Sequence, residues 1–216
     1  MDSVIGLAAY LAFLGLSLLV ICTPGQDTAL TIRNTLLGRR RAGIATALGV
    51  AAGQAIWTVA TSAGLAVVLA ASGPLFLAIP LAGAAYLIYL GARSLAGAIS
   101  RRPSSEATTS STSVQLSPRS ALVQGILSNL SNAKMVAFFI SLLPQFAGQH
   151  PSFVLLLALG FNFCLLTLAW LVVYAFAVER MSGWLRRGDV RRVIDGLLGA
   201  VLVGLGLRVT SQALAR

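Results

Sequence analysis

Apolar segments long enough to cross a lipid bilayer recur along this chain. Six can be counted, at about residues 4–22, 43–71, 74–95, 120–144, 152–178 and 193–214. At least five of them reach the length of about 20 apolar residues that a membrane-spanning helix needs. Only 10% of the residues are charged and the mean hydropathy is +0.86, values outside the range of soluble globular proteins. We therefore expect an all-α integral membrane protein.

Basic residues gather in every second connection between these segments. The N-terminus and the second and fourth connections hold no Lys or Arg. The first, third and fifth connections hold Arg33, Arg39, Arg40, Arg41, Arg93, Arg101, Arg102, Arg119, Arg180, Arg186, Arg187, Arg191 and Arg192. Arg-rich connections lie on the cytoplasmic side, which predicts six transmembrane helices with both termini in the periplasm. This topology accounts for the net charge of +10, so nucleic acid is not an expected partner.

A polar, Ser/Thr-rich stretch divides the chain into two halves. It lies at about 101–119 and shows no apolar periodicity, which predicts a disordered cytoplasmic linker. The halves, about 1–98 and about 120–216, hold three apolar segments each and form a single membrane domain over 1–216. Because three is odd, the halves enter the membrane from opposite sides. This is the arrangement of two inverted three-helix repeats.

The first segment of the first half is interrupted by Thr-Pro-Gly-Gln-Asp. Residues 4–37 as one helix would be about 51 Å long, far more than the roughly 30 Å hydrocarbon core requires. Thr23 is a typical N-cap, Pro24 suits the first helical position, and Gln26 would complete a capping box. We therefore expect one helix to end near Cys22 and another to begin at Pro24.

The first segment of the second half is interrupted in the same way. The run Asn-Leu-Ser-Asn-Ala-Lys occupies 129–134, and Ser131 or Asn132 could cap a second half-helix. In transporters, broken helices at membrane depth form ion and substrate sites. The paired breaks therefore predict a binding site near the bilayer midplane.

Two charged residues mark these breaks: Asp27 in the first half and Lys134, the only lysine, in the second. An isolated charge in a membrane helix costs about 2.5–3.5 kcal/mol on insertion scales, so such residues are usually paired or face water. We expect Asp27 to be the counter-ion of Lys134, and the pair to hold a zwitterion whose carboxylate faces Lys134 and whose ammonium faces Asp27. The alternative is structural: Asp27 favours a helix N-terminus and Lys134 snorkels toward an interface.

The candidate site is assembled from the residues around both breaks. Its main members, expected to bind substrate or protons, are Asp27, Lys134, Thr23, Pro24, Gly25, Asn129 and Asn132. Weaker candidates are Gln26, Gln54, Tyr86 and Asn162. Amides in apolar spans more often bond to neighbouring helices, and tyrosines there more often pack or anchor. No catalytic residue, metal or cofactor is expected, because the two cysteines show no ligand spacing.

Two other classes of function stay open at this point. Cys22 directly precedes Thr-Pro-Gly, and membrane proteins that transfer electrons between thiols and disulfides place cysteines beside prolines in two paired breaks. The second break has no cysteine, and Cys164 lies in the following segment, which counts against this alternative. The other is a pore or a non-catalytic scaffold, whose flux would be indifferent to a proton gradient.

Several motifs taken together resemble the LysE/RhtB family of amino-acid exporters. They are Thr-Pro-Gly-Gln-Asp at 23–27, Gly-Ala-Ala-Tyr-Leu-Ile-Tyr-Leu-Gly at 83–91, Asn-Leu-Ser-Asn-Ala-Lys at 129–134 and Pro-Gln-Phe at 144–146. The resemblance implies a multi-pass secondary transporter of the bacterial inner membrane that exports an amino acid or a derivative by proton antiport. Its expected partners are a small zwitterionic amino acid, protons and membrane lipid, and a homodimer stays open.

Three positions depart from the pattern of that family. Gln26 replaces a second proline after the glycine, Ala133 replaces the proline before the lysine, and Pro80 stands where a basic residue is often found. The first two leave the predicted caps intact. The third leaves the substrate's charge preference open.

Overall fold

The computed structural model describes residues 6–64, 116–147, 152–185 and 188–214, with part of the stretch 81–99. Every regular element in these residues is helical, which confirms the all-α prediction. The predicted linker at 101–119 lies largely outside the described residues, as does much of the predicted segment 74–95.

In the described part of the chain, two helices, or three if a bent pair counts as one, contain apolar stretches long enough to be candidate membrane spans. The two that qualify alone are α2 (Gln26–Ser62) and the stretch Phe153–Met181 of α7 (Phe153–Leu185). A bent pair, α5 (Pro118–Leu130) with Ala133–Ala147, would make a third. By length and composition these helices are candidate membrane spans, as the sequence predicts for a membrane protein.

The first apolar segment ends where the sequence predicts a break. α1 (Leu7–Cys22) stops because Thr23 closes its last turn, with its N–H and its Oγ1 donating to the carbonyl of Leu19 at 3.1 and 2.7 Å. Pro24 follows, and proline both lacks an N–H and disfavours helical backbone in the residue before it. Thr23 therefore caps the end of α1, and the prediction that it caps the start of the next helix is wrong.

The next helix begins two residues later than the sequence predicts. Gly25 is the N-cap of α2, in extended backbone at φ −147° and ψ −168°. Pro24 consequently lies outside the helix, and Gln26 opens the helix instead of completing a capping box. Asp27 lies in the first turn, where a negative charge is favourable.

α2 is not one rod but a hairpin of two antiparallel arms. The chain reverses at Arg39, whose backbone angles of φ 60° and ψ −170° are not helical. Asn34 Nδ2 donates to Thr46 Oγ1 at 3.0 Å, although residues twelve apart in a straight helix would be about 18 Å apart. We call residues 26–37 the first arm and residues 40–62 the second arm.

The second predicted break is also present. α5 ends at Leu130, and Asn132 is the N-cap of α6 (Ala133–Ala137), accepting a hydrogen bond from the backbone N–H of Lys134 at 3.1 Å. The helices on either side of this break are bent by 51°. Of the two predicted caps, Ser131 and Asn132, it is Asn132 that caps α6. Beyond α6 the helix changes its winding, first to the π-helix η1 (Phe138–Leu142) and then to the 3-10 helix η2 (Leu143–Ala147).

Glycines let α5 and the second arm of α2 pack with their backbones in direct contact. A Cβ on Gly49 would collide with the carbonyl of Leu122, and one on Gly125 would collide with the carbonyl of Thr46. Small residues at such positions are what close packing of membrane helices requires. Gly49 and Gly125 therefore allow close backbone packing between α5 and the second arm.

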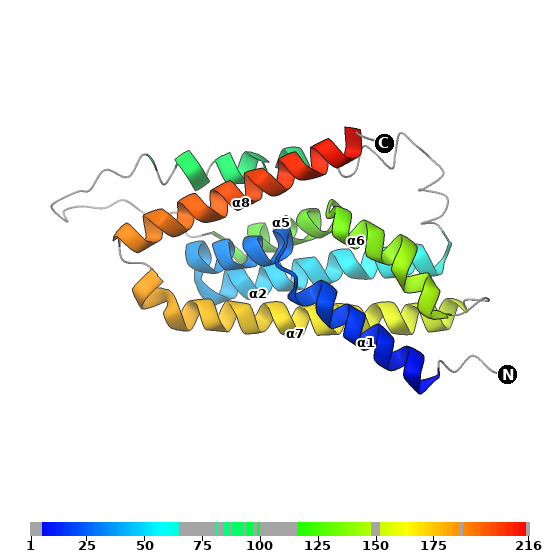
Figure 1. The fold of residues 1–216 in the computed structure, drawn as a ribbon. Coiled ribbons are helices and arrows are strands. Elements are labelled where there is room, and N and C mark those ends of the chain that lie inside the picture. Colours follow the sequence, from blue (N-terminus) through cyan, green and yellow to red (C-terminus); the bar gives the residue numbers. More distant parts are fainter. Residues whose placement is uncertain are drawn as a thin grey trace.

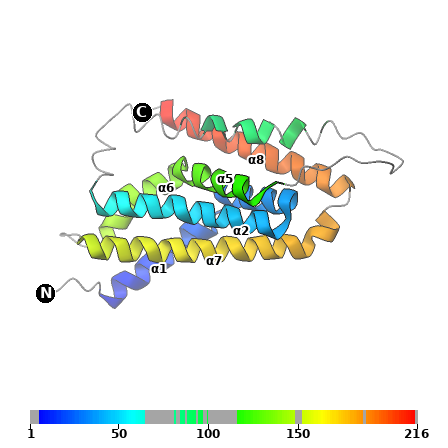
Figure 2. The ribbon, with the colours of Figure 1, turned by 180° about the vertical axis from the view of Figure 1, so that it is seen from behind.

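The remaining helices enclose this pair on two sides. Figures 1 and 2 show α7 along one side of α2 and α5, and α8 (Gly188–Leu214) with residues of the 81–99 stretch along the other. α8 meets that stretch through two glycines, since a Cβ on Gly91 would lie 2.7 Å from the carbonyl oxygen of Gly199. The largest fully buried side chains in the core around α1, α6, η1 and α7 are Phe13, Phe138, Phe139 and Phe163.

The outer surface of the helices is apolar. Several large aliphatic residues there are largely accessible, with exposed fractions of 74% for Leu7, 73% for Val154 and 67% for Leu165. Many exposed large apolar side chains are expected on a surface that faces lipid.

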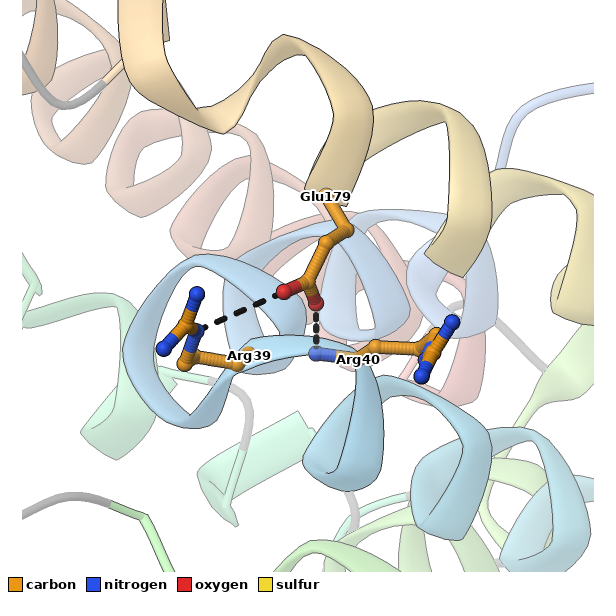
Figure 3. A network of polar contacts seen from close by, with 3 residues as sticks. All are labelled: Arg39, Arg40 and Glu179. Carbon is orange, nitrogen blue, oxygen red and sulfur yellow. Dashed lines mark hydrogen bonds and ion pairs between the residues drawn. The ribbon is translucent and has the colours of Figure 1, made fainter.

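The reversal in α2 is held by the end of α7. The Glu179 carboxylate accepts a hydrogen bond from the Arg40 backbone N–H, and its other oxygen lies 3.4 Å from Arg39 Nε (Figure 3). The Arg40 guanidinium lies 5.0 Å from the ring centroid of Phe176. Glu179 thus contacts Arg39 at the reversal and Arg40, the first residue of the second arm.

Candidate functional site

The two breaks meet at the carboxylate of Asp27. Its Oδ1 accepts a hydrogen bond from Ser128 Oγ at 2.7 Å, and its Oδ2 accepts bonds from Asn129 Nδ2 and Asn132 Nδ2, both at 3.0 Å. All four residues are buried. Since the three donors belong to the end of α5 and the break after it, the structure joins the first turn of α2 to the second break.

Neighbouring residues keep these donors in position. The Gln26 amide donates to the backbone carbonyl of Ser128, which ties the same two segments together. Gly53 in the second arm faces Asn129, and a Cβ there would lie 2.9 Å from the Cβ of Asn129. A side chain at Gly53 would therefore push Asn129 away from Asp27.

Lys134 has partners of a different kind. Its Nζ donates to the backbone carbonyls of Val20 and Thr23, both at 3.0 Å. Carbonyls at a helix C-terminus lack helical partners and carry partial negative charge, so the ammonium is well placed there. Gly25 leaves room for it, because a Cβ at Gly25 would lie 3.3 Å from Nζ.

Asp27 and Lys134 do not form the direct ion pair that the sequence predicts, although their opposite charges interact electrostatically. Among the residues that the structure describes, the ion pair present joins Arg39 to Glu179. Three side-chain donors satisfy Asp27, and two free carbonyls at the end of α1 satisfy Lys134. Each charged group therefore has hydrogen-bond partners of its own, in addition to its electrostatic interaction with the other.

Both charged side chains nevertheless line one small cavity. Its polar lining consists of Asp27, Thr28, Gln54, Lys134, Thr167 and Trp170. The apolar lining consists of Ile21, Met135, Phe163 and Leu171. The water-accessible volume is about 20 Å³, and a single buried water needs roughly 10–15 Å³. In this conformation the cavity admits about one water molecule and not an amino acid.

Two polar atoms in the cavity lining have no hydrogen-bond partner. Gln54 Nε2 donates to Thr167 Oγ1 at 3.2 Å, but Gln54 Oε1 is buried without a partner, as is Trp170 Nε1. A native protein leaves few such atoms unbonded, and each one calls for an explanation. Water or a ligand in the cavity would supply the missing bonds.

Buried polar contacts continue from Asp27 toward the reversal in α2. The hydroxyl of Thr31 donates to the Asp27 backbone carbonyl at 2.8 Å. One turn further, Asn34 Nδ2 donates to Gln124 Oε1 at 3.1 Å as well as to Thr46. Polar side chains thus cross between the first arm and α5 at both ends of their contact, and buried polar groups at membrane depth are costly and often functional.

Other predicted residues lie away from the cavity. Asn162 Nδ2 donates to the hydroxyl of Tyr10 at 2.9 Å and so joins α7 to α1. Tyr86 packs against the cluster of Leu30 and Leu202 beside α8. Thr23 and Pro24 form the break itself, and both are exposed. Thr23 still contributes its carbonyl to Lys134.

Four polar residues of the site are absent from the predicted set: Thr28, Ser128, Thr167 and Trp170. Ser128 directly precedes the polar run at 129–134, so extending that run by one residue would have included it. Thr167 and Trp170 lie on the same face of α7 as Phe163, at helical spacing. A threonine and a tryptophan on one face of an apolar helix are a weak signal, because most such residues only pack.

The thiols do not support electron transfer. Cys22 is exposed at the end of α1, whereas Cys164 is buried with its Sγ 3.7 Å from Thr58 Oγ1. Both are free cysteines on different helices, and neither lines the cavity.

Comparison with known proteins identifies the family. The family model described as LysE type translocator matches residues 17–213. An uncharacterized membrane protein, YrhP of Bacillus subtilis, is 32% identical over 92% of this chain and 96% of its own length. The threonine efflux protein of Escherichia coli K12 is 28% identical over 89% and 92% of the two chains. The homoserine/homoserine lactone efflux protein of Salmonella typhimurium is 27% identical over 94% and 96%.

No solved structure matches the chain. The family match covers most of the sequence and both breaks. The chain therefore belongs to the LysE type translocator family, and it is a membrane transporter rather than an enzyme.

Proposed function

We propose that this protein exports a small amino acid across the bacterial inner membrane by proton antiport with alternating access. The observation that carries the proposal is a buried carboxylate and an ammonium group lining one cavity where two broken helices meet. Relatives named for threonine efflux and for homoserine efflux support an amino acid as the substrate. The proposed architecture is six transmembrane helices in two inverted repeats.

The remaining bonding capacity of the two charged groups suits a zwitterion. An ionised carboxylate offers about four acceptor positions, of which Asp27 uses three. An ammonium group has three donors, of which Lys134 uses two. The fourth position on Asp27 would accept the substrate ammonium, and the third proton of Lys134 would bond the substrate carboxylate.

The partners of Asp27 also suggest where a transported proton would reside. Oδ2 is bonded by two amide NH₂ groups, which can only donate, whereas Oδ1 is bonded by the Ser128 hydroxyl, which can also accept. A proton on Oδ1 would reverse the bond to Ser128 and leave Oδ2 undisturbed. A neutral Asp27 would bind the substrate ammonium weakly, so proton entry from the periplasm would release the substrate there.

Alternating access requires the cavity to enlarge. At about 20 Å³ it excludes an amino acid, so we assign the observed conformation to a closed state of the cycle. The bend of 51° after α5 and the change of winding in η1 and η2 provide places where the helix could move.

Uptake by inverted membrane vesicles tests the proposal. Wild-type vesicles with an acidic lumen should accumulate labelled threonine, and an uncoupler should abolish the accumulation. Asp27→Asn should lose gradient-driven accumulation at an unchanged protein level, by about 100-fold or more. Glu106→Gln, a matched carboxylate substitution in the predicted linker, should behave as wild type. Full gradient-driven uptake by Asp27→Asn would refute the mechanism.

A further inference from the structure

The unpartnered atoms of the cavity form a complementary pair. Gln54 Oε1 can only accept a hydrogen bond, and Trp170 Nε1 can only donate one. Both atoms are buried without a partner, and both residues line the cavity. A single group that bonded to both atoms would have to donate one hydrogen bond and accept another.

The orientation of the Gln54 amide follows from its neighbour. The Thr167 hydroxyl donates its proton to the backbone carbonyl of Phe163 at 3.0 Å. Its oxygen can then only accept, so the NH₂ of Gln54 must be the group that faces Thr167, at 3.2 Å. The Gln54 carbonyl oxygen is thereby left for a ligand. With 1% of its surface exposed, Gln54 cannot bond to bulk water instead.

We propose that Gln54 and Trp170 form a subsite for a hydroxyl group on the side chain of the transported amino acid. The hydroxyl donates to Gln54 Oε1 and accepts from Trp170 Nε1. The subsite rests on the proposed function, since it assumes that the cavity binds an amino acid, and it narrows the substrate to hydroxylated ones.

The size and lining of the cavity fit this assignment. Even in this closed conformation, its volume of about 20 Å³ leaves room for one oxygen-sized group, and the larger cavity of an open state would hold the rest of the amino acid. Met135 and Phe163 supply apolar walls for the attached carbon atoms. A methyl group in the same place would leave both polar atoms unbonded, a loss that buried polar groups make costly.

Equilibrium binding to the purified protein tests the subsite with two isosteric ligands. Threonine and valine differ by a hydroxyl in place of a methyl group. We expect wild type to bind threonine at least tenfold more tightly than valine. Trp170→Phe removes the N–H, and Gln54→Met removes the acceptor. Each change should reduce the preference by about three- to tenfold, as expected for one hydrogen bond, mainly through weaker threonine binding.

Trp57→Phe is the matched control. The Trp57 indole N–H is also buried without a partner, but Trp57 packs in the core and does not line the cavity. This variant should keep the wild-type preference.

The outcomes separate the subsite from the proposed function. Equal binding of threonine and valine by wild type, or equal weakening of both ligands in Trp170→Phe, would overturn the subsite and indicate a bound water there. Binding with the expected preference, but no gradient-driven uptake in vesicles, would uphold the subsite and overturn the antiport. Absence of binding for both ligands would overturn both.

Discussion

Ser128 is the residue whose role at the site is easiest to isolate. Its hydroxyl is the side-chain partner of Asp27 Oδ1, at 2.7 Å. Ser131, in the same break, donates only to backbone carbonyls, at 2.6 Å to Leu127 and 3.1 Å to Ser128. Substituting alanine for Ser128 removes a hydrogen bond to the Asp27 carboxylate, whereas the same substitution at Ser131 removes only bonds to backbone carbonyls.

We expect Ser128→Ala to reduce gradient-driven uptake by about tenfold or more. The change removes a charge-assisted hydrogen bond and the group that could accept a proton from Asp27, and such bonds contribute about 1.5–3 kcal/mol. Uptake by inverted vesicles at saturating threonine measures the effect. Ser131→Ala should retain most of the activity. Equal losses in the two variants would mean that the hydroxyls act only through the shape of the break.

At the residue scale, the sequence reveals which groups are costly to bury but not which partners satisfy them. Asp27, Lys134, Asn129 and Asn132 stand out because charges and amides are rare in apolar spans. The partners of Lys134 are backbone carbonyls of α1. Every residue has such a carbonyl, so no side-chain pattern could have indicated them.

At the element scale, the reversal in α2 stores strain at Arg39. Its backbone, at φ 60° and ψ −170°, is close to a region that only glycine adopts readily, and a residue held in such a region costs about 1–3 kcal/mol. The exposed ion pair with Glu179, in which 61% of the Arg39 side chain is accessible, recovers at most about 1 kcal/mol.

Arg39→Gly should therefore raise the free energy of unfolding by about 1 kcal/mol. The strain it removes exceeds the ion pair it loses. Thermal unfolding of the purified protein in detergent measures the change. Arg41→Gly is the matched control: Arg41 is exposed and helical, so glycine there should destabilise by about 1 kcal/mol. A lower unfolding temperature in Arg39→Gly would show that the contacts of Arg39 outweigh its strain.

Helix ends were harder to predict than helix breaks. Pro24 and the polar run at 129–134 locate both breaks, because the groups that interrupt an apolar helix are visible in the sequence. Thr23 has the side chain of an N-cap, yet its hydroxyl bonds backward to Leu19. A threonine hydroxyl can bond to the preceding turn as readily as to the following one, and only the backbone path decides between them.

At the scale of the whole molecule, the three Arg-rich connections converge at one end. The reversal at Arg39 contacts Glu179, at the end of α7 that precedes the fifth connection. A Cβ on Gly38 would lie 2.5 Å from the carbonyl oxygen of Leu116, at the end of the third connection. From the distribution of charge alone, the sequence predicts that the three connections lie on the same side of the membrane. The contacts of Arg39 and Gly38 place described residues of these connections close together.

Fusions to reporter proteins determine whether the Arg-rich connections lie on the cytoplasmic or the periplasmic side of the membrane. Positive charge is retained in the cytoplasm, and an odd number of spans separates each terminus from the third connection if the six-span prediction holds. Alkaline phosphatase, active only in the periplasm, should be active when fused after Arg216 and inactive when fused after Ser110. A green fluorescent protein that matures only in the cytoplasm should give the opposite pattern. Activity of the same reporter at both sites would mean an even number of spans in the second half, which an inverted three-helix repeat does not allow.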